Sequence, residues 1–126
     1  MNKNTTKTTL VIGASENPAR YSNMALKLLK AFGHPVLAFG KQNGKIDDFN
    51  IETQLSVFQG QDIDTITMYL NPQNQEKYYQ DIIQLHPKRV IFNPGTENED
   101  FVDLLHQNAI ETEEACTLIL LKSAQY

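Results

Sequence analysis

The sequence lacks several features that mark particular classes of protein. Only one of its 126 residues is a cysteine, so no internal disulfide can form, which indicates a reducing compartment. No stretch approaches 18 consecutive apolar residues, and the polar start (MNKNTTK) is not followed by the apolar segment of a secretory signal. We therefore expect no membrane-spanning segment and no export, and predict a cytoplasmic location.

An excess of positive charge is also missing. The chain has 11 lysines and arginines against 15 aspartates and glutamates, a formal net charge of -4. A general nucleic-acid binder needs a basic face, so we expect no nucleic-acid partner. The length suits one domain with a single core, and we predict a flexible tail over residues 1–7 and one domain over residues 8–126.

What the sequence does contain is an alternation of short apolar strands with amphipathic helices. Strands are predicted at residues 10–12, 36–39, 65–70, 89–92 and 110–113, with a short edge strand at 52–57. Helices are predicted at residues 22–32, 72–85, 97–107 and 115–121. This order predicts an α/β fold, Rossmann-like and doubly wound, with a mostly parallel sheet of about five strands and helices on both faces.

The connection between the first strand and the first helix is the most informative stretch. The apolar run Leu10–Ile12 ends at Gly13, a polar loop with a turn at Asn17–Pro18 follows, and Ser22 is the predicted N-cap of the helix. Free backbone N–H groups in such a loop can bind a phosphate, and Arg20 would add a fork of donors. The loop has neither a G-x-G-x-x-G nor a Walker A pattern, so an ordinary strand-to-helix connection with a solvated arginine remains an alternative.

The segment after the second strand also lacks something. A dinucleotide-binding fold usually has an acidic residue there that holds the ribose of NAD, whereas this chain reads Phe39-Gly40-Lys41-Gln42. NAD is therefore disfavoured. Lys41 would suit a phosphorylated ribose, as in NADP or coenzyme A, although a solvated loop lysine is the simpler explanation of this residue taken alone.

Groups suited to catalysis are few. The three histidines, His34, His86 and His106, have no partner at triad or metal-ligand spacing. We expect Cys116 to be a small buried residue rather than a reactive thiol, and Glu97 and Glu114 to be a helix-start residue and a solvated residue rather than acid–base groups. No nucleophile–base set appears, so no catalytic residue and no metal site are predicted.

Motifs at the strand ends resemble those of small stand-alone CoA-binding domain proteins, relatives of the CoA-binding domain in the succinyl-CoA synthetase alpha subunit. The matching stretches are Val11 to Ser15, Asn17 to Ser22, Gly33 to Val36, Asn71–Pro72, Ile91 to Asn98 and Glu114 to Leu118. The resemblance implies a Rossmann-like domain that binds coenzyme A or an acyl-CoA, and it brings no activity with it.

The resemblance also implies a set of site residues. The β-strand-to-helix loop would contact the phosphates through Gly13, Ala14, Ser15, Asn17, Pro18, Arg20, Tyr21 and Ser22. The adenosine and its 3′-phosphate would lie beside Phe39, Gly40 and Lys41, and the pantetheine beside Asn71, Pro72, Asn93, Pro94 and Gly95. Two alternatives stay open: an NADP-dependent or acyl-CoA-processing enzyme, and a vestigial fold that acts as a protein-interaction subunit. A homodimer is also compatible with the apolar C-terminal segment.

Overall fold

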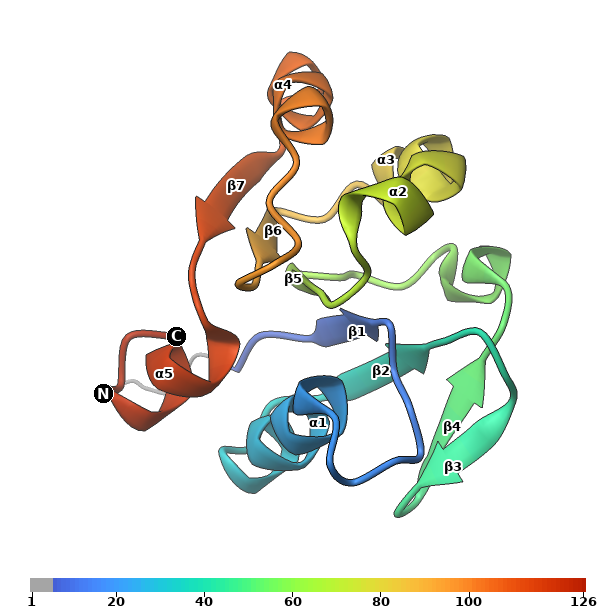
Figure 1. Cartoon of the computed structure of the whole chain (residues 1–126), viewed down its shortest axis with the longest axis vertical. Coiled ribbons are helices and arrows are strands. Elements are labelled where there is room, and N and C mark those ends of the chain that lie inside the picture. The colour runs from blue at the N-terminus through green and yellow to red at the C-terminus, as the bar shows by residue number, and fades with distance from the viewer. Residues whose placement is uncertain (1–5) are drawn as a thin grey trace.

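The computed structural model describes residues 6–126, so residues 1–5 of the predicted tail lie outside the described residues. Strands and helices alternate along the chain as predicted (Figure 1). The strands are β1 (Thr9–Ile12), β2 (Val36–Phe39), β3 (Gly44–Ile46), β4 (Phe49–Glu52), β5 (Thr65–Met68), β6 (Arg89–Phe92) and β7 (Glu111–Glu114). The helices are α1 (Tyr21–Ala31), η1 (Leu55–Phe58), α2 (Pro72–Gln75), η2 (Glu76–Tyr78), α3 (Tyr79–Leu85), α4 (Glu99–Gln107) and α5 (Thr117–Lys122).

The strands form one sheet in the order β3-β4-β2-β1-β5-β6-β7. All neighbouring pairs are parallel except β3 and β4, which form an antiparallel hairpin at one edge. The predicted α/β class and mostly parallel sheet are thus confirmed, with seven strands in place of about five. Because β1 is the central strand, the loop that follows it lies in the middle of the end of the sheet where the parallel strands finish.

The hairpin is the main departure from the prediction. The edge strand expected at 52–57 is wrong, because β4 ends at Glu52 and residues Leu55–Phe58 form a 3-10 turn. In the hairpin, Ile46 and Ile51 are buried, and Asp47 in the turn has a positive φ of 52°. With one buried side chain in each strand, the hairpin has no apolar run or alternation that could be read from the sequence.

The core consists of two layers, one on each face of the sheet. Side chains of β1 alternate between them, with Leu10 and Ile12 in one layer and Val11 in the other. The first layer packs under η1, α3 and α4, whose contributions include Ile82 and Phe101. The second layer packs under α1 and α5, so helices cover both faces, as predicted.

Helix α1 begins and ends close to its predicted limits. Ser22 is not the N-cap, however: Arg20 holds that position in an extended conformation, makes no side-chain capping bond, and Ser22 is buried in the first turn. The helix buries Ala25 and Leu29, whereas Met24 is 39% exposed. At the other end Gly33 adopts a φ of 88° and its N–H donates to the Lys30 carbonyl, which is the C-terminal turn expected of this glycine.

A cluster of side chains closes the end of the sheet where the strands begin. The N–H of Lys7 donates to Nδ1 of His34, and the His34 ring meets the Tyr126 ring edge-on at 4.9 Å. The hydroxyls of Tyr126 and Thr9 are hydrogen-bonded, and the guanidinium of Arg89 lies over the Tyr126 ring at 4.6 Å. This cluster ties residues from both ends of the chain to the sheet.

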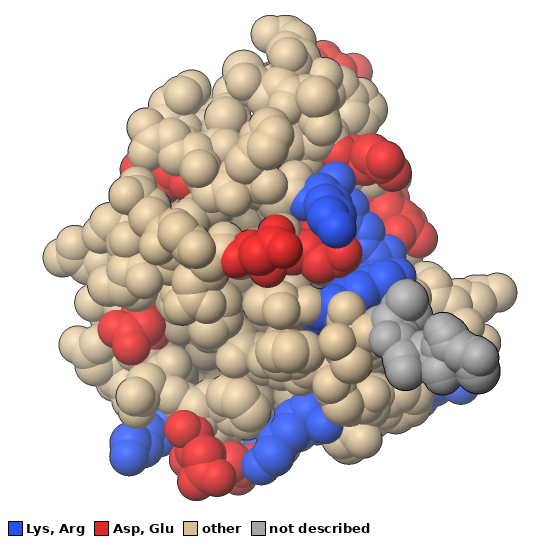
Figure 2. All heavy atoms as spheres, turned by 180° about the vertical axis from the view of Figure 1, so that it is seen from behind, with Lys and Arg blue, Asp and Glu red and all other residues tan. Residues whose placement is uncertain are grey.

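The face shown in Figure 2 carries basic and acidic residues next to one another. Two ion pairs of this kind are Lys88 with Asp64 at 3.9 Å and Arg89 with Glu113 at 3.0 Å. Among residues 6–126, no helix is both long and apolar enough to cross a membrane.

Candidate functional site

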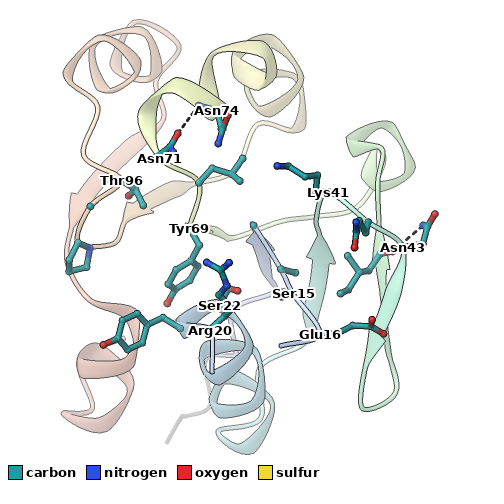
Figure 3. A pocket seen from close by; sticks show the side chains of 18 residues that line it. Ser15, Glu16, Arg20, Ser22, Lys41, Asn43, Tyr69, Asn71, Asn74 and Thr96 are labelled. Atoms are coloured by element: carbon teal, nitrogen blue, oxygen red, sulfur yellow. Dashed lines mark hydrogen bonds between the residues drawn. The ribbon is translucent and has the colours of Figure 1, made fainter. Parts of the chain in front are cut away.

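A cavity of about 640 Å³ lies where β1, β2, β5 and β6 end (Figure 3). Ligands of open parallel sheets bind at this edge. The β1–α1 loop contributes Gly13, Ala14, Ser15, Glu16, Arg20, Tyr21 and Ser22. A second part, the hairpin wall, consists of Lys41, Gln42, Asn43 and Ile51, and a third, the neutral wall, of Leu70, Asn71, Asn74, Pro94, Gly95 and Thr96, with Tyr69 between them and the loop.

Two glycines allow the backbone segments to meet at the bottom of this cavity. Gly13 has a φ of 97°, and a Cβ there would come within 3.1 Å of the Tyr69 backbone. A Cβ on Gly40 would overlap the carbonyl oxygen of Ala14, which lies directly against it. Since any other residue would push the β1–α1 loop away from β2 or β5, both positions favour glycine.

The backbone amides of the loop divide into two groups. The N–H groups of Gly13 and Ala14 both donate to the Phe39 carbonyl at 2.9 Å, so they serve the fold. The Asn17–Pro18 turn uses further amides, with the Ala19 N–H donating to Asn17 Oδ1 at 2.9 Å. Four amides have no hydrogen-bond partner within residues 6–126, and all belong to cavity residues: Ser15, Glu16, Tyr21 and Ser22.

Unused amides at a helix start form an anion site. Here two of the four lie at the start of the loop, and two lie in the first turn of α1, whose dipole adds positive potential. The residues that carry these four amides therefore all line one cavity, and their donors are available to an anionic ligand.

The charged side chains of the cavity are two cations and one carboxylate. In Figure 3, Arg20 and Lys41 extend over the cavity from different elements, and both are exposed. Glu16 is held beside the hairpin, because its Oε2 accepts the Lys45 N–H at 2.8 Å. A Cβ on Gly44 would fall within 2.5 Å of the Glu16 carboxyl carbon, so this contact also depends on a glycine. The formal charge of the lining is +1, although the whole chain carries -4.

The neutral wall is held by buried amide side chains. Gln75 is fully buried, and its Nε2 donates to the carbonyls of Leu70 and Thr96, at 2.8 Å each. Its Oε1 accepts from Nδ2 of Asn98 at 2.9 Å, and Asn98 caps α4 through Phe101 N–H. The loops after β5 and β6 are thus joined through one side chain.

Tyr69 lies beside the loop, and burial changes the acidity of its hydroxyl group. Burial raises the pKa of the Tyr69 hydroxyl to about 12, so the group stays protonated at neutral pH. Its oxygen is buried and has no hydrogen-bond partner among the described residues. Cys116, at the N-cap of α5, does not line the cavity, and no cluster of three potential metal ligands exists within residues 6–126.

The structure brings most of the predicted site residues together. The cavity is lined by Gly13, Ala14, Ser15, Arg20, Tyr21, Ser22, Lys41, Asn71, Pro94 and Gly95. The remaining predicted residues do not line it: Asn17, Pro18, Phe39, Gly40, Pro72 and Asn93.

Their positions explain why. Asn17 and Pro18 form an exposed turn, Phe39 is a core residue, and Gly40 lies beneath the loop. The Asn93 side chain is buried, donates to Thr67 and accepts the Thr117 N–H at 2.8 Å.

Eight cavity residues were not among the predicted site residues: Glu16, Gln42, Asn43, Ile51, Tyr69, Leu70, Asn74 and Thr96. Glu16, Leu70 and Thr96 could have been included, because each adjoins a residue already assigned to the site. Asn43 and Ile51 depend on the hairpin, which the sequence did not reveal.

Comparison with known proteins agrees with this architecture. A crystal structure described only as that of an uncharacterized protein is 41% identical, with a TM-score of 0.92 over 98% of this chain and 100% of that one. The cell-free ID.343 protein from Thermus thermophilus has a TM-score of 0.84 at 19% identity, covering 96% of this chain and 91% of that one. A hypothetical protein from Pyrococcus horikoshii OT3 has a TM-score of 0.83 at 19% identity, covering 94% and 83%.

At 19% identity the likeness shows the fold alone. No protein of curated function matches the chain significantly. The profile of the family described as the CoA binding domain matches residues 7–122. Because that match spans nearly the whole sequence, the chain belongs to the CoA binding domain family.

Proposed function

We propose that this protein binds coenzyme A, or an acyl-CoA, in the cavity at the carboxyl ends of the strands, with the diphosphate at the β1–α1 loop. The observation that carries the proposal is the set of four unused backbone amides, at Ser15, Glu16, Tyr21 and Ser22, beside Arg20. The family supports CoA as the ligand in general terms, and the donor set supports this place for its phosphates.

The donors fit a diphosphate in number and in kind. A diphosphate has several anionic oxygens, and amides at the two ends of the loop can serve different oxygens. The guanidinium of Arg20 can bind two oxygens at once. The amides of Gly13 and Ala14 take no part, because the Phe39 carbonyl already accepts both.

The hairpin wall fits the adenosine part with its 3′-phosphate. Lys41 follows β2 and provides the cation that this phosphate needs, and no carboxylate occupies the adjoining positions Gln42 and Asn43. Ile51 also lines this part of the cavity, although its side chain is almost wholly buried. This part of the site is the one that would distinguish CoA from dephospho-CoA.

The neutral wall fits the pantetheine chain, which is uncharged and carries two amides. Asn71 and Asn74 line this wall and carry side-chain amides. Asn71 is the N-cap of α2, and its Oδ1 accepts the Asn74 N–H at 2.9 Å. The rest of the wall is small or uncharged, so it does not repel the chain or compete for the phosphates.

Calorimetric titration with CoA and dephospho-CoA tests the proposal. We expect both to bind, CoA about threefold to tenfold more tightly, because one exposed lysine contact separates them. Arg20→Ala should weaken CoA binding by about 1–3 kcal/mol, as for a charged hydrogen bond. Lys27→Ala removes a cation from α1 outside the cavity and should leave the affinity unchanged.

Negligible heats for both ligands would end the proposal. Displacement of bound CoA by NADP at comparable concentration would instead favour a nicotinamide cofactor in the same cavity.

A further inference from the structure

Gln75 makes an unusual set of contacts for a glutamine in a short polar helix. Its side chain is 0% exposed, and all its hydrogen-bonding groups are used. Both N–H bonds of Nε2 point to backbone carbonyls, those of Leu70 and Thr96. An apolar side chain would leave both carbonyls without donors, which explains why an amide occupies this buried position.

The two carbonyls belong to different loops of the same wall. Leu70 follows β5 and Thr96 follows β6, and both residues line the cavity. Since both bonds measure 2.8 Å and start from one nitrogen atom, the side chain sets how far apart the two loops lie.

A second amide holds Gln75 in this orientation. Asn98 Nδ2 donates to Gln75 Oε1 at 2.9 Å and to the Tyr79 hydroxyl at 2.8 Å, while Asn98 Oδ1 accepts the Phe101 N–H. The Asn98 side chain is therefore fixed by α3 and α4, and it fixes the direction in which the Gln75 amide points. A fully satisfied buried network of this kind specifies one geometry.

The network reaches only one part of the cavity. Neither Gln75 nor Asn98 is bonded to the β1–α1 loop or to the hairpin wall, whose own bonds run through Phe39 and Glu16. A change at Gln75 should thus move the neutral wall and leave the anion-binding loop in place.

We infer that Gln75 is a positioning residue for ligand binding: it sets the separation of the Leu70 and Thr96 loops and so shapes the arm that receives the uncharged chain attached to the nucleotide. This inference rests on the proposed function, and it adds that recognition is divided between two independently built halves of the cavity. Gln75 contacts no ligand itself, because its side chain is buried behind the wall.

The test compares CoA with adenosine 3′,5′-bisphosphate, which carries the phosphorylated nucleoside but no pantetheine. Both are titrated into wild-type protein, Gln75→Met and Gln73→Met, with the folded fraction measured by circular dichroism. Gln73 is an exposed residue of the same helix outside the cavity, so it is the matched control. In Gln75→Met we expect CoA binding to weaken about tenfold, since a displaced wall loses one or two hydrogen bonds to the chain, and bisphosphate binding to change less than about twofold.

A gentler variant guards against simple unfolding. Asn98→Ser keeps an N-cap side chain for α4 but removes the donors to Gln75 and Tyr79, so it should change the ratio of the two affinities in the same direction by a smaller factor. If Gln75→Met does not fold, Asn98→Ser decides.

The possible failures are distinct. Wild-type protein that binds neither ligand contradicts the proposed function. Wild-type binding combined with an unchanged ratio of affinities in the folded variants contradicts the role of Gln75, whether both ligands weaken equally or neither does.

Discussion

The neutral wall and the hairpin wall face each other across one cavity and are built in opposite ways. In the neutral wall, the side-chain amide of Gln75 is fully buried and joins two loops, through a buried bond to the Thr96 carbonyl and a partly buried bond to the Leu70 carbonyl. On the other side of the cavity, the β3–β4 hairpin behind the hairpin wall is joined to the β1–α1 loop by an exposed bond, from Lys45 N–H to the Glu16 carboxylate at 2.8 Å. Buried bonds fix a geometry, whereas an exposed bond competes with water and contributes little.

This difference indicates which wall of the cavity has a fixed shape and which can adjust to a ligand. We expect the neutral wall to keep its shape without a ligand, so that a chain that enters it would lose little free energy in ordering the protein. The hairpin wall can be displaced at small cost and can adapt to the group that lies against it. Substitutions on the two walls should therefore differ sharply in their effects on stability and on binding.

The largest expected effect is on stability when the neutral wall loses its amide. Gln75→Met leaves the carbonyls of Leu70 and Thr96 without donors in a buried site, and we expect the free energy of unfolding to fall by about 2–4 kcal/mol. Urea denaturation followed by circular dichroism measures this change. The control Gln73→Met should stay within about 0.5 kcal/mol of wild type. Equal losses for the two variants would mean that the wall is not held in this way.

Gly40→Ala tests the position where the β1–α1 loop and Ile51 of the hairpin wall both pack against the backbone. The new methyl group would overlap the Ala14 carbonyl oxygen and lie 3.0 Å from Ile51 Cγ2, so the loop must shift. We expect a loss of about 1–3 kcal/mol in the free energy of unfolding and a loss of CoA affinity, because the loop carries the proposed anion site. Gly60→Ala introduces a methyl group with no atom within 4 Å at a φ of 87°, so it should cost about 1 kcal/mol and leave binding intact.

A smaller effect, on affinity alone, is expected at Glu16. Glu16→Gln keeps an oxygen that can accept the Lys45 N–H but removes the carboxylate from a cavity proposed to bind phosphates. Stability should change by less than about 0.5 kcal/mol, because the residue is exposed, and CoA should bind about twofold to fivefold more tightly at low salt. Calorimetry at two salt concentrations checks this. A gain that persists undiminished at high salt would argue against an electrostatic cause.

The sequence predicts the buried elements of the fold better than the exposed hairpin. The buried runs of β1, β5 and β6 and the helix end at Gly33 are visible because burial and glycine geometry leave direct traces in residue type. The hairpin is not visible, since β3 and β4 each bury only one side chain, that of Ile46 and that of Ile51. The prediction of a Ser22 N-cap failed because the first turn of α1 is left open, with its amides unused.

The site shows the same limit. Sequence alone identifies the glycine of the β1–α1 loop. It does not show that the Phe39 carbonyl accepts the N–H groups of Gly13 and Ala14, while those of Ser15 and Glu16 stay without a partner among residues 6–126. Gln75 is hidden for a related reason. A glutamine in a polar helix reads as a solvated residue, and only the tertiary structure places it between two carbonyls.

The smallest effect concerns His34, which lies on neither wall, at the opposite end of the sheet. Burial lowers the pKa of His34 below its ordinary value of 6.5, and the nearby cations Lys7 and Arg89 lower it further, against the opposing influence of Asp64. The folded protein therefore favours the neutral imidazole, whose Nδ1 accepts the Lys7 N–H. The contribution of His34 to stability should be constant above pH 6.5 and should decrease as the pH falls through 6.5, since the unfolded chain then binds the extra proton more readily.

Urea denaturation between pH 7.5 and pH 5 measures this dependence. His34→Asn removes the titrating group, and its amide oxygen can take over the bond from Lys7, so the decrease should be reduced. His86→Asn replaces an exposed histidine that already has a positive φ of 51°, and it should retain the wild-type decrease. Since the cluster is remote from the cavity, the ratio of CoA to adenosine 3′,5′-bisphosphate affinities in His34→Asn should match that of wild type at each pH. A changed ratio would show that the His34 cluster affects ligand binding in the cavity. The two walls would then not act independently of the rest of the fold.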